Sequence, residues 1–385
     1  MNSIHSSNKR NICLITNTEP QGGAHGVVVS LAQALSQMDH RVDVIILGNV
    51  EGYTPPSNYN FNFHIIETKT KTKNSAIKEI DRITKYMQSI QDAQLVKSKI
   101  SEIGVNFDLI ISNFLLANMT CKKLNLPNTY YCIHAAVSPV IAKYYNNKTG
   151  FSKFLWKILY IFSIRNLYKN QNLITVSKGI EDDLTKLGIQ TKTMRTIYNP
   201  FDFNDIKKQA KAYPVEEKDY IIHVGRFDGP HKRHDILIHA YKQSDIKEKL
   251  LLLGDDNKGN GGAIKQLVVD LELQDKVIFK GFNPNPYPYI KNAKVMVLSS
   301  DYEGLPTVLI ESLILKTPVI STNCLSGPSE ILIDELKPFL SPIGDVDALA
   351  NNIKNMADNP VKITNKYIDK FSAEKSAEQY LSLCN

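Results

Sequence analysis

The sequence lacks three features that would each define a class of protein. No apolar run reaches the ~18–20 residues of a membrane-spanning helix, and the longest candidates are 154–162 and 308–315. The five cysteines are odd in number and widely spaced, without a CxxC pair, so neither a disulfide framework nor a zinc site is predicted. The first residues are polar and contain no secretory apolar segment. We therefore expect a cytoplasmic protein.

A dinucleotide-binding fingerprint is also missing. Gly22 and Gly23 follow the first apolar run, where a glycine pair lets backbone amides approach a phosphate at a helix N-terminus. This pair is not a GxGxxG motif, and the second apolar run ends on Leu47-Gly48-Asn49, without an acidic residue. The pattern disfavours a nicotinamide-dependent dehydrogenase. A tight turn that simply needs glycine is the other interpretation of the pair.

Acidic residues are absent from a long internal stretch. Between 109 and 180 there is no Asp or Glu, whereas nine Lys or Arg occur, and 142–169 is rich in Tyr, Phe and Trp. A basic, aromatic-rich helical segment is typical of an interface with anionic lipid. Nucleic acid would be an alternative partner, but no nucleic-acid-binding motif accompanies the segment, and we expect none. The other alternative is an ordinary helix with its aromatic residues in the core and its lysines in water.

What the sequence contains is an alternation of short apolar runs with amphipathic stretches over 385 residues. Strands are predicted at 12–16, 42–47, 63–66, 109–112, 130–133, 173–176, 220–224, 250–253, 277–280, 295–298 and 319–321. Helices are predicted between them, for example at 27–38, 76–103, 236–242 and 263–271. Strands that alternate with helices in this way form a parallel sheet covered on both faces. The fold class is therefore α/β, with two Rossmann-like, doubly wound domains.

The Asn-Pro break at 199–200 marks the domain boundary. We predict a first domain over 1–200 and a second over 201–370. The last segment, 371–385, has helical periodicity and is expected to pack back on the first domain.

Two cations follow the first strand of the second series. Arg226 and Lys232 flank a Gly-Pro turn after 220–224, beside the carboxyl end of a strand, which is where open α/β sheets bind ligands. A guanidinium fork and an ammonium point charge together suit a diphosphate. Two solvated surface cations are the alternative.

A third motif joins two carboxylates, Glu303 and Glu311, across a Gly-Leu-Pro turn. Pro306 suits the first turn of a helix, and Gly304 and Leu305 would then offer free amides to an anion. Glu311 lies among apolar residues and is expected to be buried, so it needs hydrogen-bond partners. Sugar hydroxyls would serve, and neighbouring backbone or a cation is the alternative.

The two carboxylates, the Arg226–Lys232 loop and the Gly22-Gly23 turn, in this order, resemble glycosyltransferase family 4. The resemblance spans nearly the whole chain. It implies the GT-B fold, in which two Rossmann-like domains face each other across a cleft.

The resemblance also implies a role for each motif. Arg226 and Lys232 would hold the nucleotide diphosphate, together with Gly22, Gly23 and the 304–306 turn. Glu303 would contact hydroxyls of the donor sugar, and Glu311 those of the ribose.

Two further positions match the family. His134, at the end of the strand 130–133, corresponds to the histidine that reaches the donor sugar; a semi-buried structural histidine is the alternative. The backbone around Phe282 would frame the base.

The activity implied is that of a retaining glycosyltransferase that uses a nucleotide-sugar, most simply a UDP-sugar. Its acceptor would be a saccharide or a lipid-linked saccharide in lipopolysaccharide or other surface-polysaccharide biosynthesis. No Asp-x-Asp-like metal motif is evident, so we expect neither a metal nor another cofactor. Two rivals stay open. One is an inverting enzyme with His25 as base, and the other is a non-catalytic sugar-nucleotide-binding module.

Overall fold

The computed structural model describes residues 9–17, 23–48, 59–68, 78–146, 150–227, 230–254 and 261–384. The chain divides into two compact units. The first comprises Met1–Val176, Ile180–Pro200 and Ala373–Asn385, and the second comprises Ser177–Gly179 and Phe201–Ser372.

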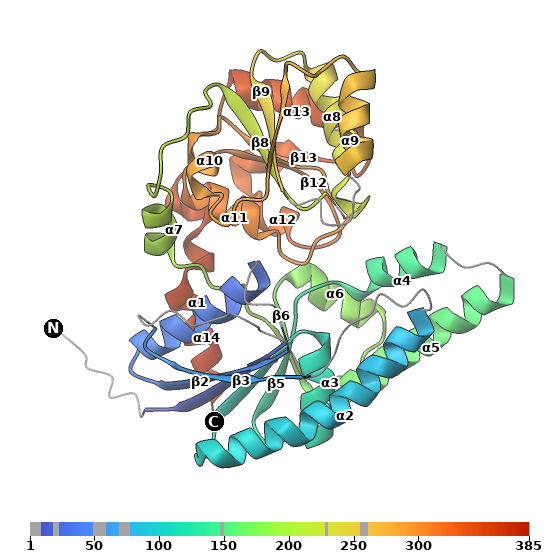
Figure 1. Ribbon diagram of the computed structural model, residues 1–385, viewed down its shortest axis with the longest axis vertical. Coiled ribbons are helices and arrows are strands. Elements are labelled where there is room, and N and C mark those ends of the chain that lie inside the picture. Colours follow the sequence, from blue (N-terminus) through green and yellow to red (C-terminus); the bar gives the residue numbers. More distant parts are fainter. Residues whose placement is uncertain are drawn as a thin grey trace. The chain divides into compact units, whose positions relative to one another are not determined.

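The first unit is built on a seven-stranded parallel sheet (Figure 1). In spatial order its strands are β3 (Asn62–Ile66), β2 (Arg41–Leu47), β1 (Asn11–Thr16), β4 (Leu109–Asn113), β5 (Thr129–Ile133), β6 (Asn172–Thr175) and β7 (Thr193–Thr196). The central strands are almost wholly buried, because helices cover both faces and leave no solvated side.

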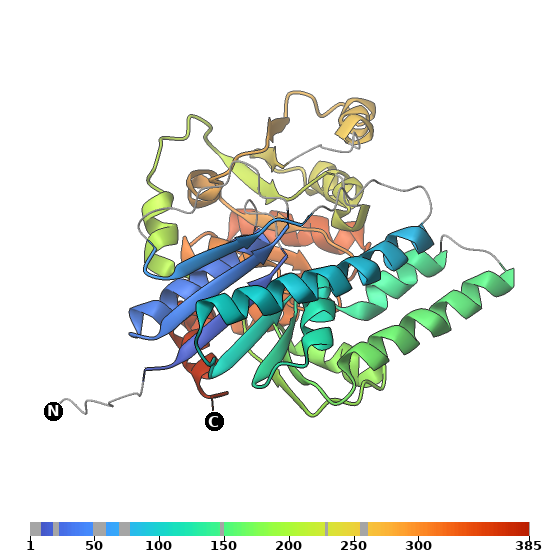
Figure 2. The same cartoon turned by 60° about the horizontal axis from the view of Figure 1, so that its bottom comes forward.

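Helices alternate with these strands. They are α1 (Gly23–Gln37), α2 (Lys78–Ile103), α3 (Leu115–Leu124), α4 (Val137–Asn146), α5 (Gly150–Tyr168), α6 (Lys178–Lys186) and the final α14 (Ala373–Leu381). α2 packs on α3, and α1 packs on α14. α14 presents Ala373, Ser376, Ala377 and Tyr380 to the core, and Ser376 Oγ donates to the carbonyl of Tyr198 at 3.0 Å. α4 and α5 lie together and extend beyond the sheet (Figures 1 and 2).

The second unit has a six-stranded parallel sheet. Its spatial order is β10 (Val277–Gly281), β9 (Lys249–Leu253), β8 (Tyr220–Val224), β11 (Met296–Leu298), β12 (Val319–Thr322) and β13 (Leu340–Ser341).

Its helices fall into two packed groups. One group contains α8 (His234–Ser244), α9 (Gly261–Asp270) and α13 (Val346–Asp358). The other contains α7 (Phe203–Gln209), α10 (Tyr287–Asn292) and α11 (Thr307–Ile314), with α12 (Pro328–Ile331) beside α11. Short 3₁₀ turns occupy Pro230–Lys232, Asp334–Phe339, Asn365–Tyr367 and Asp369–Phe371. Right-handed crossovers that run outward from β8 in opposite directions place their helices on opposite faces of the sheet.

The predicted α/β class is confirmed, and each predicted strand is present with its ends shifted by at most one residue. Two strands were not predicted. β7 is an edge strand whose sequence is TMRT and whose side chains are half-buried or exposed, so it contains no apolar run. β13 is only two residues long.

Candidate donor-binding site

The point where the order of strands reverses defines the candidate site of the second unit. Successive strands lead away from β8 through β9 to β10, and the chain then returns to β11 on the other side of β8. Where the loops of two neighbouring strands lead away in opposite directions, a crevice opens at the carboxyl ends of those strands. Open α/β sheets bind ligands in this crevice. Lys232 follows β8 and Glu303 follows β11, so the topology brings together two motifs that are 71 residues apart.

Lys232 and Glu303 form an ion pair in this crevice. Lys232 Nζ donates to Glu303 Oε1 at 2.6 Å, and the two side chains are 16% and 13% exposed. The pair is shielded but reaches the surface, so a ligand can approach it without unfolding of the loops. Neither side chain is a solvated surface charge.

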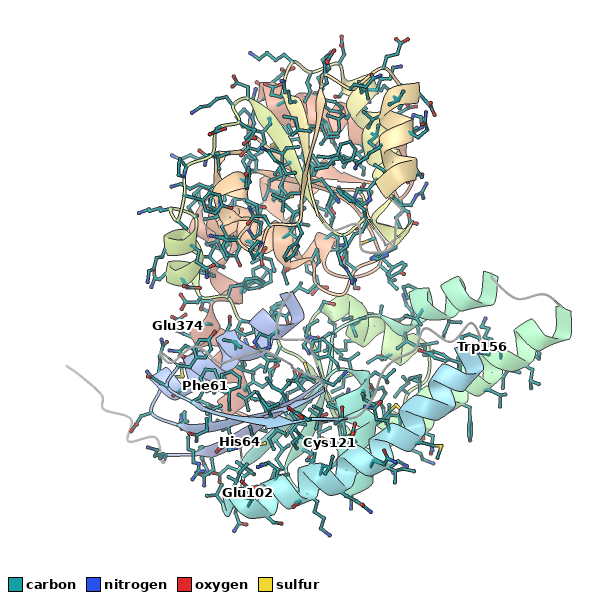
Figure 3. All side chains as sticks on the ribbon, viewed as in Figure 1. Phe61, His64, Glu102, Cys121, Trp156 and Glu374 are labelled. Carbon is teal, nitrogen blue, oxygen red and sulfur yellow. The ribbon has the colours of Figure 1, made fainter. Side chains whose placement is uncertain are left out.

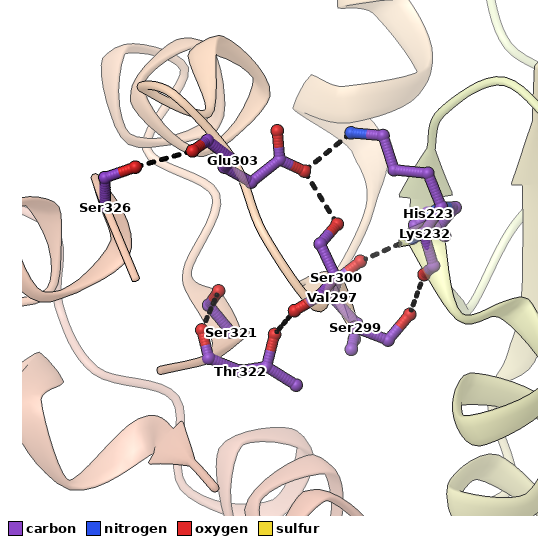
Figure 4. A network of polar contacts seen from close by, with 9 residues as sticks. All are labelled: His223, Lys232, Val297, Ser299, Ser300, Glu303, Ser321, Thr322 and Ser326. Carbon is purple, nitrogen blue, oxygen red and sulfur yellow. Dashed lines mark hydrogen bonds and ion pairs between the residues drawn. The ribbon is translucent and has the colours of Figure 1, made fainter. Parts of the chain in front are cut away.

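Serine hydroxyls surround this pair (Figure 4). Ser300 Oγ donates to the same Glu303 Oε1 at 2.6 Å, and Ser326 Oγ donates to the Glu303 carbonyl at 2.5 Å. Ser299 Oγ donates to the Lys232 carbonyl at 2.7 Å. These three serines are almost completely buried. Ser299 and Ser326 hold the backbone of the two paired residues, and Ser300 holds the carboxylate itself.

The turn at 304–306 leads directly into α11. Pro306 is not in the first helical turn as predicted: it precedes the first helical residue, Thr307, with φ −69° and ψ 95°. Within the described part of the chain, the amides of Gly304 and Leu305 donate to no acceptor. Gly327, at φ +95°, packs so closely here that an added Cβ would lie 2.3 Å from Pro306 Cδ. The result is a helix N-terminus preceded by two amides without acceptors among the described residues, which suits an anion.

Glu311 lies one turn further along α11. Its side chain is half-buried, and burial raises its carboxyl pKa to about 7. Among the described residues its carboxylate forms no hydrogen bond or ion pair. The neighbouring Tyr287 hydroxyl has a raised pKa because of burial and the charge of Glu311. A carboxylate that is desolvated without partners inside the protein is available to hydroxyl donors from a ligand.

Arg226 and Phe282 are the more exposed predicted residues of this unit. Arg226 follows β8 by two residues, and Phe282, after β10, is 65% exposed. The loops after β8 and β9 approach so closely that an added Cβ on Gly254 would lie 1.9 Å from the Gly225 carbonyl. Lys232 pairs with Glu303. The convergence of Arg226 and Lys232 on one phosphate-binding point stays a prediction.

His134 belongs to the first unit and is held by two neighbours. Its Nε2 lies 3.1 Å from Asn113 Oδ1, and its ring stacks on Phe114 with centroids 4.1 Å apart. The side-chain amide nitrogen of Asn113 donates to the Ile111 carbonyl, which fixes the orientation of the amide. Asn113 Oδ1 is therefore the acceptor, and His134 Nε2 carries the hydrogen that it accepts. Burial lowers the pKa of His134 to about 3, so the ring is neutral near pH 7, with Nδ1 as an acceptor.

The N-terminal glycine motif lies partly outside the described residues. Gly22 is outside them, whereas Gly23 begins α1. His25, the candidate base of the inverting alternative, is 8% exposed in the first turn of α1, and burial lowers its pKa.

Sequence reasoning missed Ser299, Ser300, Ser326 and Asn113. Of these four residues, only Ser300 could have been found from the sequence, because it lies three residues before Glu303, within the same motif. The others reach the site through contacts between separate strands and loops, which no local spacing reveals.

Comparisons with known proteins agree with this arrangement. A family profile described as "Glycosyltransferase Family 4" matches residues 21–205, and one described as "Glycosyl transferases group 1" matches residues 204–374. The chain is 27% identical over 380 residues to an N-acetylgalactosamine-N,N'-diacetylbacillosaminyl-diphospho-undecaprenol 4-alpha-N-acetylgalactosaminyltransferase of Campylobacter jejuni, covering 94% of this chain and 96% of that one. It is 28% identical to the lipopolysaccharide 1,6-galactosyltransferase of Escherichia coli K12, over 51% of this chain and 52% of that one.

Solved structures share the fold over the whole chain. A glycosyltransferase from Rickettsia africae superposes with a TM-score of 0.69 at 18% identity, covering 98% of both chains. Anabaena HepE in complex with UDP and glucose superposes with a TM-score of 0.66 at 18% identity, covering 98% of this chain and 96% of that one.

Two parallel sheets with alternating helices, together with these structural neighbours, define the GT-B fold. The two profiles refine this assignment: the chain belongs to the glycosyltransferases of family 4, with a group 1 second domain.

Proposed function

We propose that this glycosyltransferase is a retaining enzyme that transfers a sugar from a UDP-sugar to a saccharide or lipid-linked saccharide in surface-glycan biosynthesis. The observation that carries the proposal is the Lys232–Glu303 pair beside the open amides of 304–305 and the unpartnered Glu311. This site offers positive charge for a diphosphate and carboxylates for hydroxyl groups. The names of the C. jejuni and E. coli relatives, and the UDP in HepE, support the substrate classes.

In this proposal the chain works mainly by stabilising the departing diphosphate. The bond between the anomeric carbon and the phosphate oxygen breaks, and Lys232, Arg226 and the amides of 304–305 stabilise the negative charge that develops. The acceptor hydroxyl attacks from the same side, and its proton passes to the departing phosphate oxygen. Glu303 holds the donor sugar, Glu311 the ribose, and neutral His134 accepts a hydrogen bond from a sugar hydroxyl at Nδ1. The backbone around Phe282 frames the base, and Gly22 and Gly23 approach the diphosphate.

The proposal is tested by UDP release from a panel of UDP-hexoses and UDP-N-acetylhexosamines, with GDP-sugars as controls. We expect UDP to be released from at least one UDP-sugar, at a rate that EDTA leaves unchanged, since protein cations neutralise the leaving group. NMR of the product should show the anomeric configuration of the donor. Absence of UDP release from every donor, with the protein folded, would overturn the proposal.

An inverting reaction is the second candidate, because such an enzyme needs a side-chain base near the first strand, and His25 lies in the first turn of α1, the helix that follows β1. Inversion in the NMR experiment, together with loss of activity in His25→Asn, would favour it. Stabilisation by UDP-sugars without any turnover would instead indicate a binding module.

We also propose that the first unit associates peripherally with an anionic membrane surface through 142–169. On α5, five large apolar side chains lie exposed, and their spacing places them on one side of the helix: Phe154, Leu155, Ile158, Leu159 and Phe162. Trp156, labelled in Figure 3, stacks on Tyr160 of the same helix. An ordinary core helix would bury these residues, so the exposed face supports the interfacial interpretation. Among the described residues, no helix is long and apolar enough to span a bilayer.

A further inference from the structure

The two oxygens of the Glu303 carboxylate have different surroundings. Oε1 accepts from Lys232 Nζ and from Ser300 Oγ, each at 2.6 Å. Within the described part of the chain, no residue donates to Oε2. A carboxylate oxygen has about two lone-pair sites. Oε1 is therefore fully used inside the protein, and Oε2 keeps its capacity for a ligand.

The two donors to Oε1 differ in how firmly they hold it. Lys232 carries a point charge on a flexible four-carbon chain, and a bound diphosphate would compete for its ammonium group. Ser300 is completely buried two residues after β11, and its own carbonyl accepts from Thr322 Oγ1 of β12 at 2.5 Å. The backbone of Ser300 is thus tied to the neighbouring strand β12, and the position of its hydroxyl does not depend on the diphosphate.

We propose that Ser300 is a positioning residue that holds Glu303 by Oε1 and so presents Oε2 to the hydroxyl groups of the donor sugar. This inference deepens the proposed function and rests on it. Lys232 can turn toward the diphosphate when the donor binds, because Ser300 keeps the carboxylate in place. Holding a reacting constellation ready before the substrate arrives lowers the barrier, since less order has to be created during the reaction.

The test compares Ser300→Ala with Ser300→Cys and with a matched control, Ser244→Ala. Ser244 is also a buried serine of the second unit, and its hydroxyl donates to a backbone carbonyl, that of Tyr241, at the end of α8 remote from Lys232. For each variant we would measure thermal stability, kcat for UDP release with water as acceptor, and the Kd values of UDP and of the UDP-sugar.

Ser300→Ala loses a hydrogen bond to a charged group, so its kcat should be roughly ten- to hundredfold lower than that of the wild type. The UDP-sugar should also bind more weakly. The Kd of UDP should stay within about twofold, because UDP lacks the donor sugar whose hydroxyl groups Oε2 would contact, and its ribose is assigned to Glu311. Ser300→Cys should recover part of kcat through its weak thiol donor, and Ser244→Ala should change neither Kd nor kcat.

Three results would overturn the inference. One is a wild-type kcat in Ser300→Ala. Another is an equal loss of affinity for UDP and UDP-sugar, which would indicate a distorted loop. If the wild-type protein releases no UDP from any donor, the proposed function fails first, and this inference fails with it.

Discussion

At the scale of single residues, Lys232 combines two tasks in one ammonium group. It pairs with Glu303, and the proposed reaction needs its charge at the diphosphate. An ammonium group has three donors, so both tasks are compatible. Arg226, exposed on the same loop, would add the bidentate part of the phosphate contact.

Replacing either cation should therefore lower turnover. We expect Lys232→Ala and Arg226→Ala each to reduce kcat by on the order of a hundredfold, because each removes charge that stabilises the leaving group. UDP-release kinetics would measure the effect. Lys242→Ala, an exposed lysine in the last turn of α8, is the control and should be neutral. Near-normal rates in both site variants would remove these residues from the mechanism.

The raised pKa of Glu311 predicts how the stability of the folded chain depends on pH. Burial raises its pKa from an ordinary value of 4.5 to about 7, so the folded chain binds this proton more tightly than the unfolded chain. The carboxyl therefore costs no stability below the unfolded pKa, and its ionisation lowers the free energy of unfolding as pH rises from there through about 7.

Glu311→Gln removes that ionisation. We expect the variant to be more stable than wild type by on the order of 2 kcal/mol at about pH 8, and nearly equal at about pH 4, below the unfolded pKa, as measured by denaturant unfolding. Donor affinity should change in the opposite direction, because the amide binds ribose hydroxyls less well than the carboxylate. A variant of unchanged stability and unchanged affinity would show that Glu311 neither pays a desolvation cost nor contacts the ribose.

At the scale of secondary-structure elements, α5 exposes five large apolar side chains, whereas α2 exposes three among the side chains that the structure describes: Met87, Ile90 and Leu95. Phe162 is 67% and Phe154 57% exposed, whereas Ile164 and Tyr168 near the end of the helix are buried. The helix is thus anchored by its last turns and presents its earlier turns outward. Amphipathic helices that bind membranes insert such residues at the level of the headgroups.

Liposome co-sedimentation tests this interpretation. We expect binding that needs anionic lipid, weakens with salt, and falls when Lys143, Lys148, Lys153 and Lys157 are all changed to Ser, since each cation contributes about 1 kcal/mol near the surface. Changing Phe154, Ile158 and Phe162 to Ser should remove the salt-resistant part. In the control, Val269 and Ile343, which are exposed apolar residues of the second unit, are changed to Ser, and membrane binding should be unaffected. A protein that stays in the supernatant under every condition would refute the proposal.

At the scale of the whole molecule, ligand binding should be visible as stabilisation. UDP at a hundred times its Kd should add about 2.7 kcal/mol to the free energy of unfolding by mass action, and raise the Tm accordingly. Uridine, which lacks phosphates, is the matched control and should act far more weakly. Stabilisation by uridine equal to that by UDP would contradict the phosphate-binding site.

The sequence by itself determined most of the strands and the order of the motifs. Continuous apolar runs identified the buried central strands, because a parallel strand covered on both faces needs no polar side. The same reasoning failed for β7 and β13, an exposed edge strand and a two-residue strand, which carry no such run. The sequence also indicated Glu303, Glu311 and Lys232 as chemically unusual residues.

Only the tertiary structure decided which of these residues meet and how each is held. Lys232 and Glu303 lie 71 residues apart and touch because β11 returns beside β8, a neighbour that local pattern cannot specify. In the same way His134 meets Asn113 because β5 lies beside β4. The side chains of α5 matched both a core helix and an interfacial one, and the structure shows Phe154 and Phe162 exposed. Local periodicity sets which face of a helix is apolar, whereas the packing of the other elements determines whether anything covers it.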